Sequence, residues 1–419
     1  MATVPASTPS VRDAAARSVP TTTPPTSANA HHPRSKPHPT MKKITVAVDS
    51  FKGSLSSFEV ATAAEQAVHA RLPHCQVQKI AIADGGEGTA EALITTLRGE
   101  WCEVRSHDPL MRPIKARYGL LDGGATAIIE MATASGLTLL KEEERNPLLA
   151  TTYGTGELIA DALRRGVRHL LIGIGGSATN DAGMGMLEAL GYRFYDCKGH
   201  VVAGCGARLE RVARIDASGA LPALKECLIE VACDVTNPLY GPTGAAYVYA
   251  PQKGATPDVV ERLDQGLKNF ARVVNPEAAH VPGAGAAGGL GYALQAVLGA
   301  RLRAGIDMVL DAIHFDDVVS GSDLVLTGEG RIDYQTVMGK APSGVLQRAK
   351  EQGIPVVAIG GSVADCEALR KSDFAAIVPI VAGPITLHEA MQKDVATENV
   401  RRTVEQIIRL TTLNFHKDE

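Results

Sequence analysis

The chain has 419 residues, of which 45% are hydrophobic and 21% are charged, and its formal net charge is −4. This length can supply two domains with substantial cores, and the slightly acidic balance gives no electrostatic basis for binding nucleic acid. The seven cysteines form no Cys-x-x-Cys pair and have no zinc-site spacing, which is typical of small buried side chains in a reducing compartment. We therefore expect a cytoplasmic protein without a structural metal site.

Residues 1–40 differ sharply from the rest of the chain. They are rich in Thr, Pro, Ser and Ala, contain one acidic residue, Asp13, and lack any apolar run. Such a composition cannot bury a core and predicts a disordered tail. The tail has no hydrophobic stretch of a secretory signal, although its arginines leave a transit peptide open. We expect the folded part to start at Met41.

From Met41 onward, short β-branched runs alternate with amphipathic stretches, as in a parallel α/β sheet. The elements predicted near the two ends of the chain are strands 44–50, 79–84, 323–330 and 354–362, helices 56–72 and 344–350, and a helix from about residue 87. The capping box Ser56-x-x-Glu59 marks the start of the first helix.

The pattern changes in the middle of the chain. After Trp101, prolines and alternating charges predict antiparallel strands, and residues 155–166 predict a helix that Gly166 ends. Residues 192–250 predict further short strands and turns.

The simplest organisation is a Rossmann-like parallel-sheet domain built from both ends of the chain, residues 41–104 and 292–419. An inserted α/β domain of residues 105–291 interrupts it, and ligands are expected between the two.

The uncharged stretch 281–300 is long enough to raise the question of a membrane span, and Gly285-x-x-x-Gly289 resembles a packing motif of helices in lipid. Its six glycines and one proline make it a poor spanning helix. We interpret it as a buried glycine-rich loop that leads into a helix, and expect no membrane partner.

Glycine-rich polar segments follow five of the predicted strands. They read DSFKGS, ADGGEGT, GIGGSATND, TGEGRID and AIGGS. In an open parallel sheet, ligands bind beyond the carboxyl ends of the strands, where glycines expose backbone N–H groups that favour phosphate. Five such segments are hard to attribute to tight turns alone.

Acidic residues accompany these glycines: Asp84, Asp181, Asp234, Glu329 and Asp333. Together they would repel a polyphosphate unless a hard cation such as Mg²⁺ lay between them. Phosphate-binding loops, carboxylates and Mg²⁺ point to phosphoryl transfer, in which positioning and charge neutralisation supply most of the catalysis.

A dinucleotide site is the main alternative, because Gly173, Gly175 and Ala178 match Gly-x-Gly-x-x-Gly/Ala. That motif requires an acid about twenty residues further on, at the end of the next strand. Glu188 falls inside a predicted helix and Asp196 in a turn, so neither suits the role. The phosphate-binding loop and the catalytic motifs of the common kinase folds are also missing, so a kinase of this sequence has a separate fold.

Seven segments closely resemble the type I glycerate kinases of bacteria. They are DSFKGSLSS (49–57), ADGGEGT (83–89), ATTYGTGELI (150–159), IGIGGSATNDAGMGML (172–187), CDVTNPLYGPTGAA (233–246), GAGAAGGLG (283–291) and LTGEGRIDYQT (326–336). They occur in order from Met41 to near the C-terminus.

This resemblance implies ATP-dependent phosphorylation of D-glycerate at the 2-hydroxyl, giving 2-phosphoglycerate and ADP. It also implies a two-domain fold with the active site in the cleft between the domains. A glycerate 3-kinase, a kinase of a related hydroxy acid and a non-catalytic ligand-binding sensor stay open, as does a homodimer.

Four residues are expected to act on the substrate. Lys52, just past the first strand, would hold the glycerate carboxylate or a phosphate. Arg331 would be a second clamp or a cation that stabilises the transition state; its alternative is a surface ion pair with Asp333. Asp84 and Asp234 end apolar runs, where partial desolvation raises a carboxylate pKa toward that of a general base; their alternative is capping of a helix or turn.

The remaining expected site residues bind metal or nucleotide. Glu329, Asp333 and Asp181 are expected to contact Mg²⁺ directly or through water. The residues expected to bind ATP are Gly173, Gly175, Gly176, Ser177, Gly285, Gly288 and Gly328.

Overall fold

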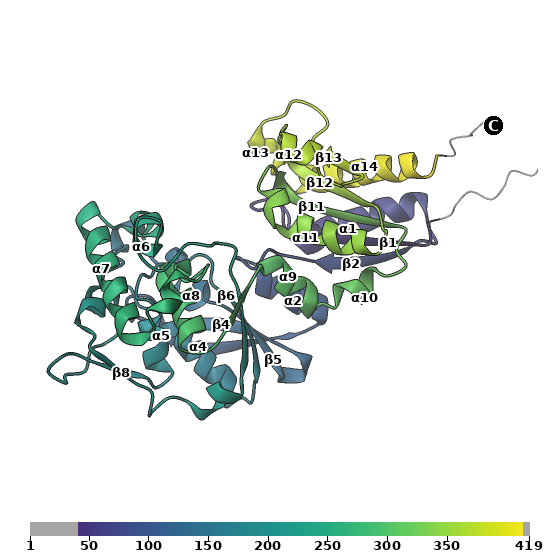
Figure 1. Ribbon diagram of the computed structural model, residues 1–419. Coiled ribbons are helices and arrows are strands. Elements are labelled where there is room, and N and C mark those ends of the chain that lie inside the picture. Colours follow the sequence, from purple (N-terminus) through teal and green to yellow (C-terminus); the bar gives the residue numbers. More distant parts are fainter. Residues whose placement is uncertain (1–40, 414–419) are drawn as a thin grey trace, which may run out of the picture. The chain divides into compact units, whose positions relative to one another are not determined.

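Strands from both ends of the chain build one five-stranded, wholly parallel sheet in the order β13-β12-β11-β1-β2 (Figure 1). The computed structural model describes residues 41–413. The strands are β1 Lys43–Val48, β2 Gln76–Ala81, β11 Leu324–Ile332, β12 Val356–Val363 and β13 Ala376–Pro379. The predicted α/β class, with a parallel sheet from both ends of the chain, is confirmed. The predicted tail, 1–40, lies outside the described residues.

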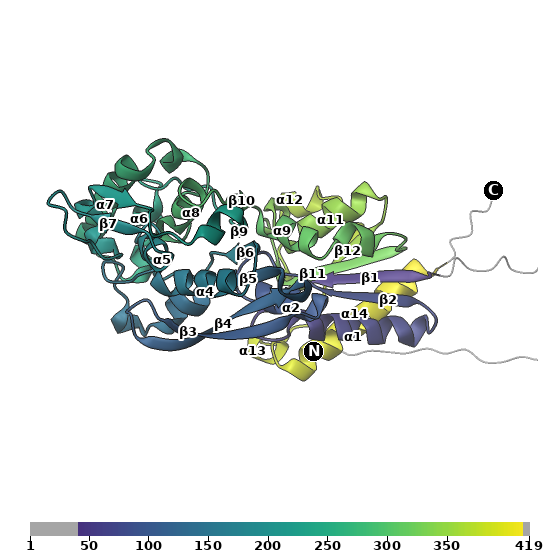
Figure 2. The same ribbon diagram turned by 90° about the horizontal axis from the view of Figure 1, so that it is seen from below.

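Helices cover both faces of this sheet. The helices are α1 Ser57–Arg71, α2 Thr89–Leu97, α9 Gly305–Ala312, α10 Phe315–Val319, α11 Ala341–Glu351, α12 Glu367–Arg370, α13 Leu387–Ala390 and α14 Lys393–Thr411. Helices α1 and α14 lie side by side (Figure 2) and share one apolar cluster with β1, whereas α2, α9 and α11 belong to another. Both bonds of the predicted capping box form, between the side chains and backbone N–H groups of Ser56 and Glu59.

Strand β2 begins and ends about three residues earlier than expected. Ile82 still donates its N–H to the Val48 carbonyl, but Ala83 and Asp84 already lead into the glycine turn that follows.

The second sheet has six strands in the order β10-β9-β6-β5-β4-β3. They are β3 Glu100–His107, β4 Pro113–Leu121, β5 Thr126–Glu130, β6 His169–Gly173, β9 Leu228–Ala232 and β10 Arg301–Arg303; β7 Arg193–Tyr195 and β8 Arg214–Asp216 pair separately. Strands β3, β4 and β5 pair antiparallel, as the sequence predicts after Trp101, and β5, β6, β9 and β10 are parallel.

The strand assignments bear on where a domain boundary can lie. A boundary after residue 104 would cut β3, and one after residue 291 would cut α8 (Ala286–Ala296). Because β3 and β10 both belong to the six-stranded sheet, we propose that the inserted domain spans about residues 100–303.

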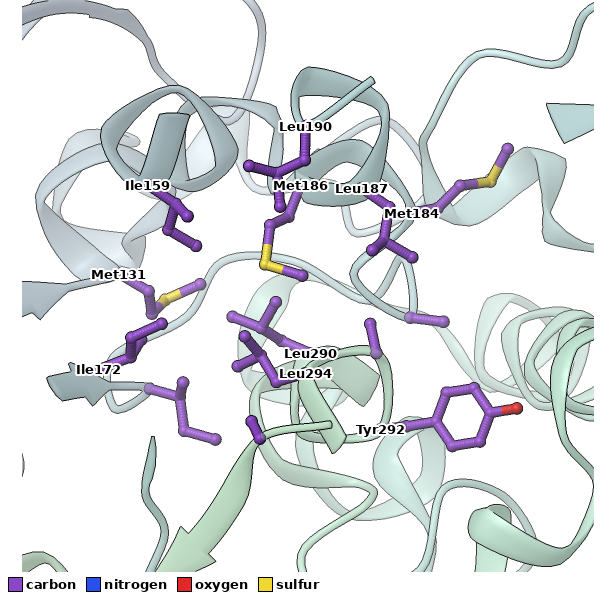
Figure 3. Close-up of a cluster of buried hydrophobic side chains, with 14 of the residues drawn as sticks. Met131, Ile159, Ile172, Met184, Met186, Leu187, Leu190, Leu290, Tyr292 and Leu294 are labelled. Carbon is purple, nitrogen blue, oxygen red and sulfur yellow. The ribbon is translucent and has the colours of Figure 1, made fainter. Parts of the chain in front are cut away.

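The six-stranded sheet packs against α3 Ala132–Ser135, α4 Tyr153–Arg164, α5 Met184–Ala189, α6 Ala245–Tyr249, α7 Pro257–Val274 and α8. In Figure 3, Met131 and Ile172 face the side chains of Met186, Leu290 and Leu294. This apolar cluster packs against the loop between β6 and α5.

The glycine-rich stretch 281–300 is a loop that enters α8, as predicted. Ala287, Gly288 and Gly289 have positive φ, so the helix is irregular at its start. None of the helices described within residues 41–413 is both long and apolar enough to cross a membrane.

Candidate active site

The carboxyl ends of six parallel strands lead into two adjoining cavities. We call the first, of about 520 Å³, the glycine cavity; its lining includes Gly85, Gly86, Gly175, Gly176, Ser177, Asp234, Tyr249, Lys253, Ala286 and Ala287. We call the second, of about 700 Å³, the carboxylate cavity; its lining includes Asp49, Ser50, Glu329, Arg331, Asp333, Lys340, Ser362 and Met391. Lys52 and Asp84 line both.

Lys52 is held at the junction by a tight turn after β1. Phe51 and Leu55 exchange backbone hydrogen bonds of 2.8 and 3.0 Å across this turn. Gly53 has φ +79°, a conformation that favours glycine. The turn fixes the backbone while the Lys52 side chain stays exposed and free to reach a ligand.

Asp84 lies in a loop that packs on the start of α9. Its Oδ1 accepts the N–H of Gly86 at 3.2 Å. Gly85 has φ +87°, and a β-carbon there would lie 2.6 Å from the Cα of Gly305, so only glycine lets the two backbones approach. This contact places Asp84 near the end of β9.

Asp234 follows β9 and faces the same cavity as Asp84. Its Oδ1 accepts the N–H of Gly305, at the start of α9, at 2.8 Å. Partial burial raises the pKa of Asp234, and the charge of Asp84 adds to the rise. The structure therefore brings the two candidate bases to one cavity wall, and burial favours proton acceptance by Asp234.

The carboxylate cavity holds two buried acids. Asp49 is 6% exposed, and its burial raises its pKa to about 6, with smaller contributions from Asp84 and Glu329. Glu329 is also buried; burial raises its pKa, although its Oε1 accepts the hydroxyl of Thr336 at 2.6 Å and its Oε2 lies 3.9 Å from Lys340 Nζ. These like charges favour the binding of a cation.

Arg331 and Asp333 form the ion pair that was the alternative to a substrate clamp. Arg331 Nε lies 3.3 Å from Asp333 Oδ2, and the Arg331 side chain is 74% exposed. Asp333 Oδ1 also accepts the N–H of Gln335 at 2.9 Å. Both side chains line the carboxylate cavity, so a ligand could break this pair at small cost.

Only part of the expected nucleotide-binding set lines a cavity. Gly175, Gly176 and Ser177 do so, whereas Gly173, Gly285, Gly288 and Gly328 do not. A β-carbon at the last three positions would lie 2.0–2.2 Å from the carbonyl oxygens of Pro238, Thr179 and Ile359 respectively. At these three glycines, and at Gly173 against the Gly85 carbonyl, the missing side chain allows close packing of the chain.

Asp181 does not suit the metal-binding role expected of it. It is fully buried and lines neither cavity. Its carboxylate accepts the N–H and hydroxyl of Thr152 at 2.8 and 2.9 Å and the N–H groups of Gly183 and Gly185. Because its carboxylate oxygens already accept these four hydrogen bonds, Asp181 organises the loop between β6 and α5.

Asp49 and Lys253 are two of the cavity residues that the sequence analysis missed. Asp49 follows the apolar run of β1 just as Asp84 follows that of β2, so the same signal could have found it. Lys253 lines the glycine cavity although its residue is only 2% exposed. A lysine in a Pro-Gln-Lys-Gly turn gives no signal of burial.

No three His, Cys, Asp or Glu side chains within residues 41–413 are grouped closely enough to hold a metal ion by themselves. The acids at the cavity junction are nevertheless oxygen ligands of the kind that Mg²⁺ prefers, and Mg²⁺ usually takes its other ligands from water and phosphate. The residues present fit that mode of binding.

Comparison with known proteins identifies the family. Residues 44–412 match the model of the glycerate kinase family. The chain belongs to this family. It is 46% identical over 370 residues to the glycerate kinase of Bacillus subtilis, covering 87% of this chain and 96% of the relative, and 44% identical over 371 residues to the glycerate 2-kinase of Escherichia coli K12, covering 87% and 97%.

A solved structure agrees with this assignment. The crystal structure of a protein described as glycerate kinase 2 from Salmonella typhimurium LT2 superposes with a TM-score of 0.81 at 46% identity, covering 88% of this chain and 98% of that one. The resemblance seen in the sequence motifs is therefore confirmed.

Proposed function

We propose that this protein transfers the γ-phosphoryl group of ATP to the 2-hydroxyl of D-glycerate, giving 2-phosphoglycerate and ADP. Membership of the glycerate kinase family and the similarity to the relative named glycerate 2-kinase support this activity. The choice of the 2-hydroxyl rests on that relative.

One observation carries the proposal: two cavities adjoin, and both are lined by Lys52 and Asp84. A kinase must bind a nucleotide and an acceptor so that the phosphoryl donor and the attacking hydroxyl meet. We assign ATP to the glycine cavity and glycerate to the carboxylate cavity. The shared lysine and carboxylate then lie where the two substrates react.

The residues at this junction have separate roles in the proposal. Asp84 or Asp234 accepts the proton of the attacking hydroxyl as the oxygen–phosphorus bond forms. Lys52 binds the glycerate carboxylate, and Arg331 joins it after leaving Asp333.

Glu329 and Asp333, with Asp49 beside them, would hold Mg²⁺. The cation would neutralise the developing charge on the phosphoryl oxygens.

The product decides between the proposal and its alternatives. The purified protein would be incubated with ATP, Mg²⁺ and D-glycerate, and the phosphorus NMR spectrum recorded, with L-glycerate and lactate as controls. We expect the resonance of 2-phosphoglycerate with D-glycerate alone. A 3-phosphoglycerate signal would establish a 3-kinase, and ATP binding without any product would support the sensor.

A thermal-shift comparison separates the dinucleotide alternative. Specific binding raises apparent stability, so ATP with Mg²⁺ should shift the unfolding midpoint and NAD should not.

A further inference from the structure

Lys253 is a buried lysine at the wall of the glycine cavity. It ends the short 3₁₀ turn Pro251–Lys253, and Gly254, with φ +92°, closes the turn against the Arg145 carbonyl. Lys253 Nζ donates to the hydroxyl of Ser177 at 2.6 Å and to the carbonyl of Thr179 at 2.7 Å. These two hydrogen bonds fix the amine against the loop that follows β6.

The charge of this amine has no direct partner in the protein. Within residues 41–413, no carboxylate lies at salt-bridge distance from Lys253. Asp181 is the acid whose charge acts on it, and that carboxylate is already held by its own donors. Burial lowers the pKa of Lys253 to about 7. A buried ammonium is costly unless an anion pairs with it.

The amine also keeps hydrogen-bonding capacity. A lysine ammonium has three N–H donors, and the two acceptors at Ser177 and Thr179 leave one of them for a ligand in the cavity.

Backbone donors lie next to this amine. Among the described residues, the N–H groups of Gly175, Gly176 and Ser177 donate no hydrogen bond to the protein. The loop that carries them is nevertheless fixed, because the Leu137 N–H bonds to the Gly176 carbonyl at 2.8 Å and the Ala178 N–H to the Ser135 carbonyl at 3.0 Å. Gly176 has φ +73°. Successive N–H groups in such a turn form anion-binding concavities.

We propose that Lys253 and the backbone N–H groups of residues 175–177 together bind the phosphate chain of the nucleotide. The inference rests on the proposed function, in which ATP occupies the glycine cavity, and adds a buried cation to the exposed Lys52 that also lines this cavity. The phosphate oxygen takes the free N–H of the amine and supplies the missing negative charge. The hydroxyl of Ser177 keeps the amine aimed into the cavity.

Calorimetric binding of ADP and of inorganic tripolyphosphate, without glycerate, tests this site. Lys253→Met keeps all but one atom of the length of the side chain and removes the charge. Lys79→Met, on β2, removes a lysine that is paired with Glu65 and is the control. A charge-assisted hydrogen bond corresponds to a loss of roughly ten- to a hundredfold in affinity for both probes, with the control unchanged. Binding of both probes by Lys253→Met within about twofold of the wild type would overturn the inference.

A second measurement on the wild-type protein covers the case in which Lys253→Met fails to fold. An adenosine polyphosphate that ends in a pyridoxal aldehyde forms an imine with a lysine beside the phosphates, and borohydride reduction makes this link permanent. We expect the labelled peptide to contain Lys253 and ADP to prevent the labelling. Labelling of other lysines alone contradicts the site.

Neither measurement requires turnover, so the two proposals can fail separately. Nucleotide binding that depends on Lys253, without phosphoglycerate formation, would reject the proposed function and keep this site. If the protein phosphorylates glycerate but its nucleotide affinity does not depend on Lys253, the proposed function stands and this site is rejected.

Discussion

The two cavities follow the same rule of topology but differ in the groups that they bury. Both lie beyond the carboxyl ends of parallel strands, as expected for α/β sheets. The carboxylate cavity, mostly at the ends of β1, β11 and β12, contains two acids, Asp49 and Glu329, whose burial raises their pKa values. The glycine cavity, at the ends of β2, β6 and β9, offers backbone N–H groups and a buried lysine.

This difference teaches how one fold prepares for two unlike ligands. Side-chain carboxylates can move, titrate and bind a cation, so they suit the place where charge changes during a reaction. Backbone donors are fixed and permanently polarised, so they suit a phosphate chain that must only be held. Lys52 and Asp84 line both cavities, so these two residues must serve both ligands.

The largest effect is expected at this junction. If Asp84 or Asp234 accepts the substrate proton, the corresponding Asn variant should still bind both substrates while kcat falls about a hundredfold or more. Initial rates measured as a function of ATP and glycerate concentration would separate kcat from KM.

The control uses the acids assigned to metal. Loss of a ligand can be offset by mass action, so excess Mg²⁺ should restore part of the rate of Glu329→Gln and Asp333→Asn but none of the rate of Asp84→Asn. Rescue in the opposite pattern would exchange the two assignments.

Asp49 tests how much folding stability the protein loses by burying an acid in the carboxylate cavity. Its pKa of about 6 in the folded protein lies above the ordinary 3.8, so the folded state binds the proton more tightly than the unfolded state. The resulting stabilisation is present below about pH 4 and is lost as the pH rises to 6. Asp49→Asn should therefore raise the free energy of unfolding at pH 7.5 by about 2–3 kcal/mol.

Urea unfolding at pH 7.5 and pH 4 measures this difference, which should nearly vanish at the lower pH. Asp365→Asn, which removes an exposed acid paired with Arg370, should show little change at either pH. A variant of Asp49 no more stable than the wild type at pH 7.5 would contradict the raised pKa.

Lys52 tests which cavity holds glycerate. If its ammonium binds the glycerate carboxylate, Lys52→Ala should raise the KM for glycerate about tenfold or more, the value of one charge-assisted hydrogen bond, and change the KM for ATP much less. A rise confined to ATP would move the lysine to the phosphate side.

Sequence reasoning located the strand-end residues because an apolar run that stops at an acid marks the end of a buried strand. It placed Lys52, Asp84, Asp234 and Glu329 in segments that the structure brings to the cavities. It could not tell the glycines apart, because the same residue type lines a cavity at Gly175 and allows a close backbone contact at Gly328.

Long-range packing explains the other misses. Lys253 contacts Ser177 across 76 positions of sequence, and no local pattern reveals such a pairing. Asp181 stands in a motif of polar and glycine residues, yet its oxygens accept hydrogen bonds from Thr152, 29 positions away in the sequence, and from Gly185 of its own segment. Hydrogen-bond satisfaction of this kind depends on the folded loop.

The smallest effect on stability is expected from substituting a glycine that has room for a β-carbon and is proposed to contact the ligand. A β-carbon at Gly175 would meet only the Cα of Gly86, at an ordinary 3.6 Å, whereas one at Gly328 would lie 2.1 Å from the Ile359 carbonyl oxygen. Gly175→Ala should therefore change the free energy of unfolding by no more than about 0.5 kcal/mol, and Gly328→Ala should lower it by about 1–3 kcal/mol.

For activity, measured on folded protein, we expect the larger effect from Gly175→Ala and the smaller one from Gly328→Ala. The added methyl at residue 175 projects beside the N–H groups proposed to bind phosphate, so it should raise the KM for ATP a few-fold in a fully folded protein. Gly328→Ala, assayed well below its melting temperature, should keep the KM for ATP of the wild type, because residue 328 lies inside the sheet between β1 and β12. Equal KM values for the two variants would mean that the loop at residue 175 does not touch the nucleotide.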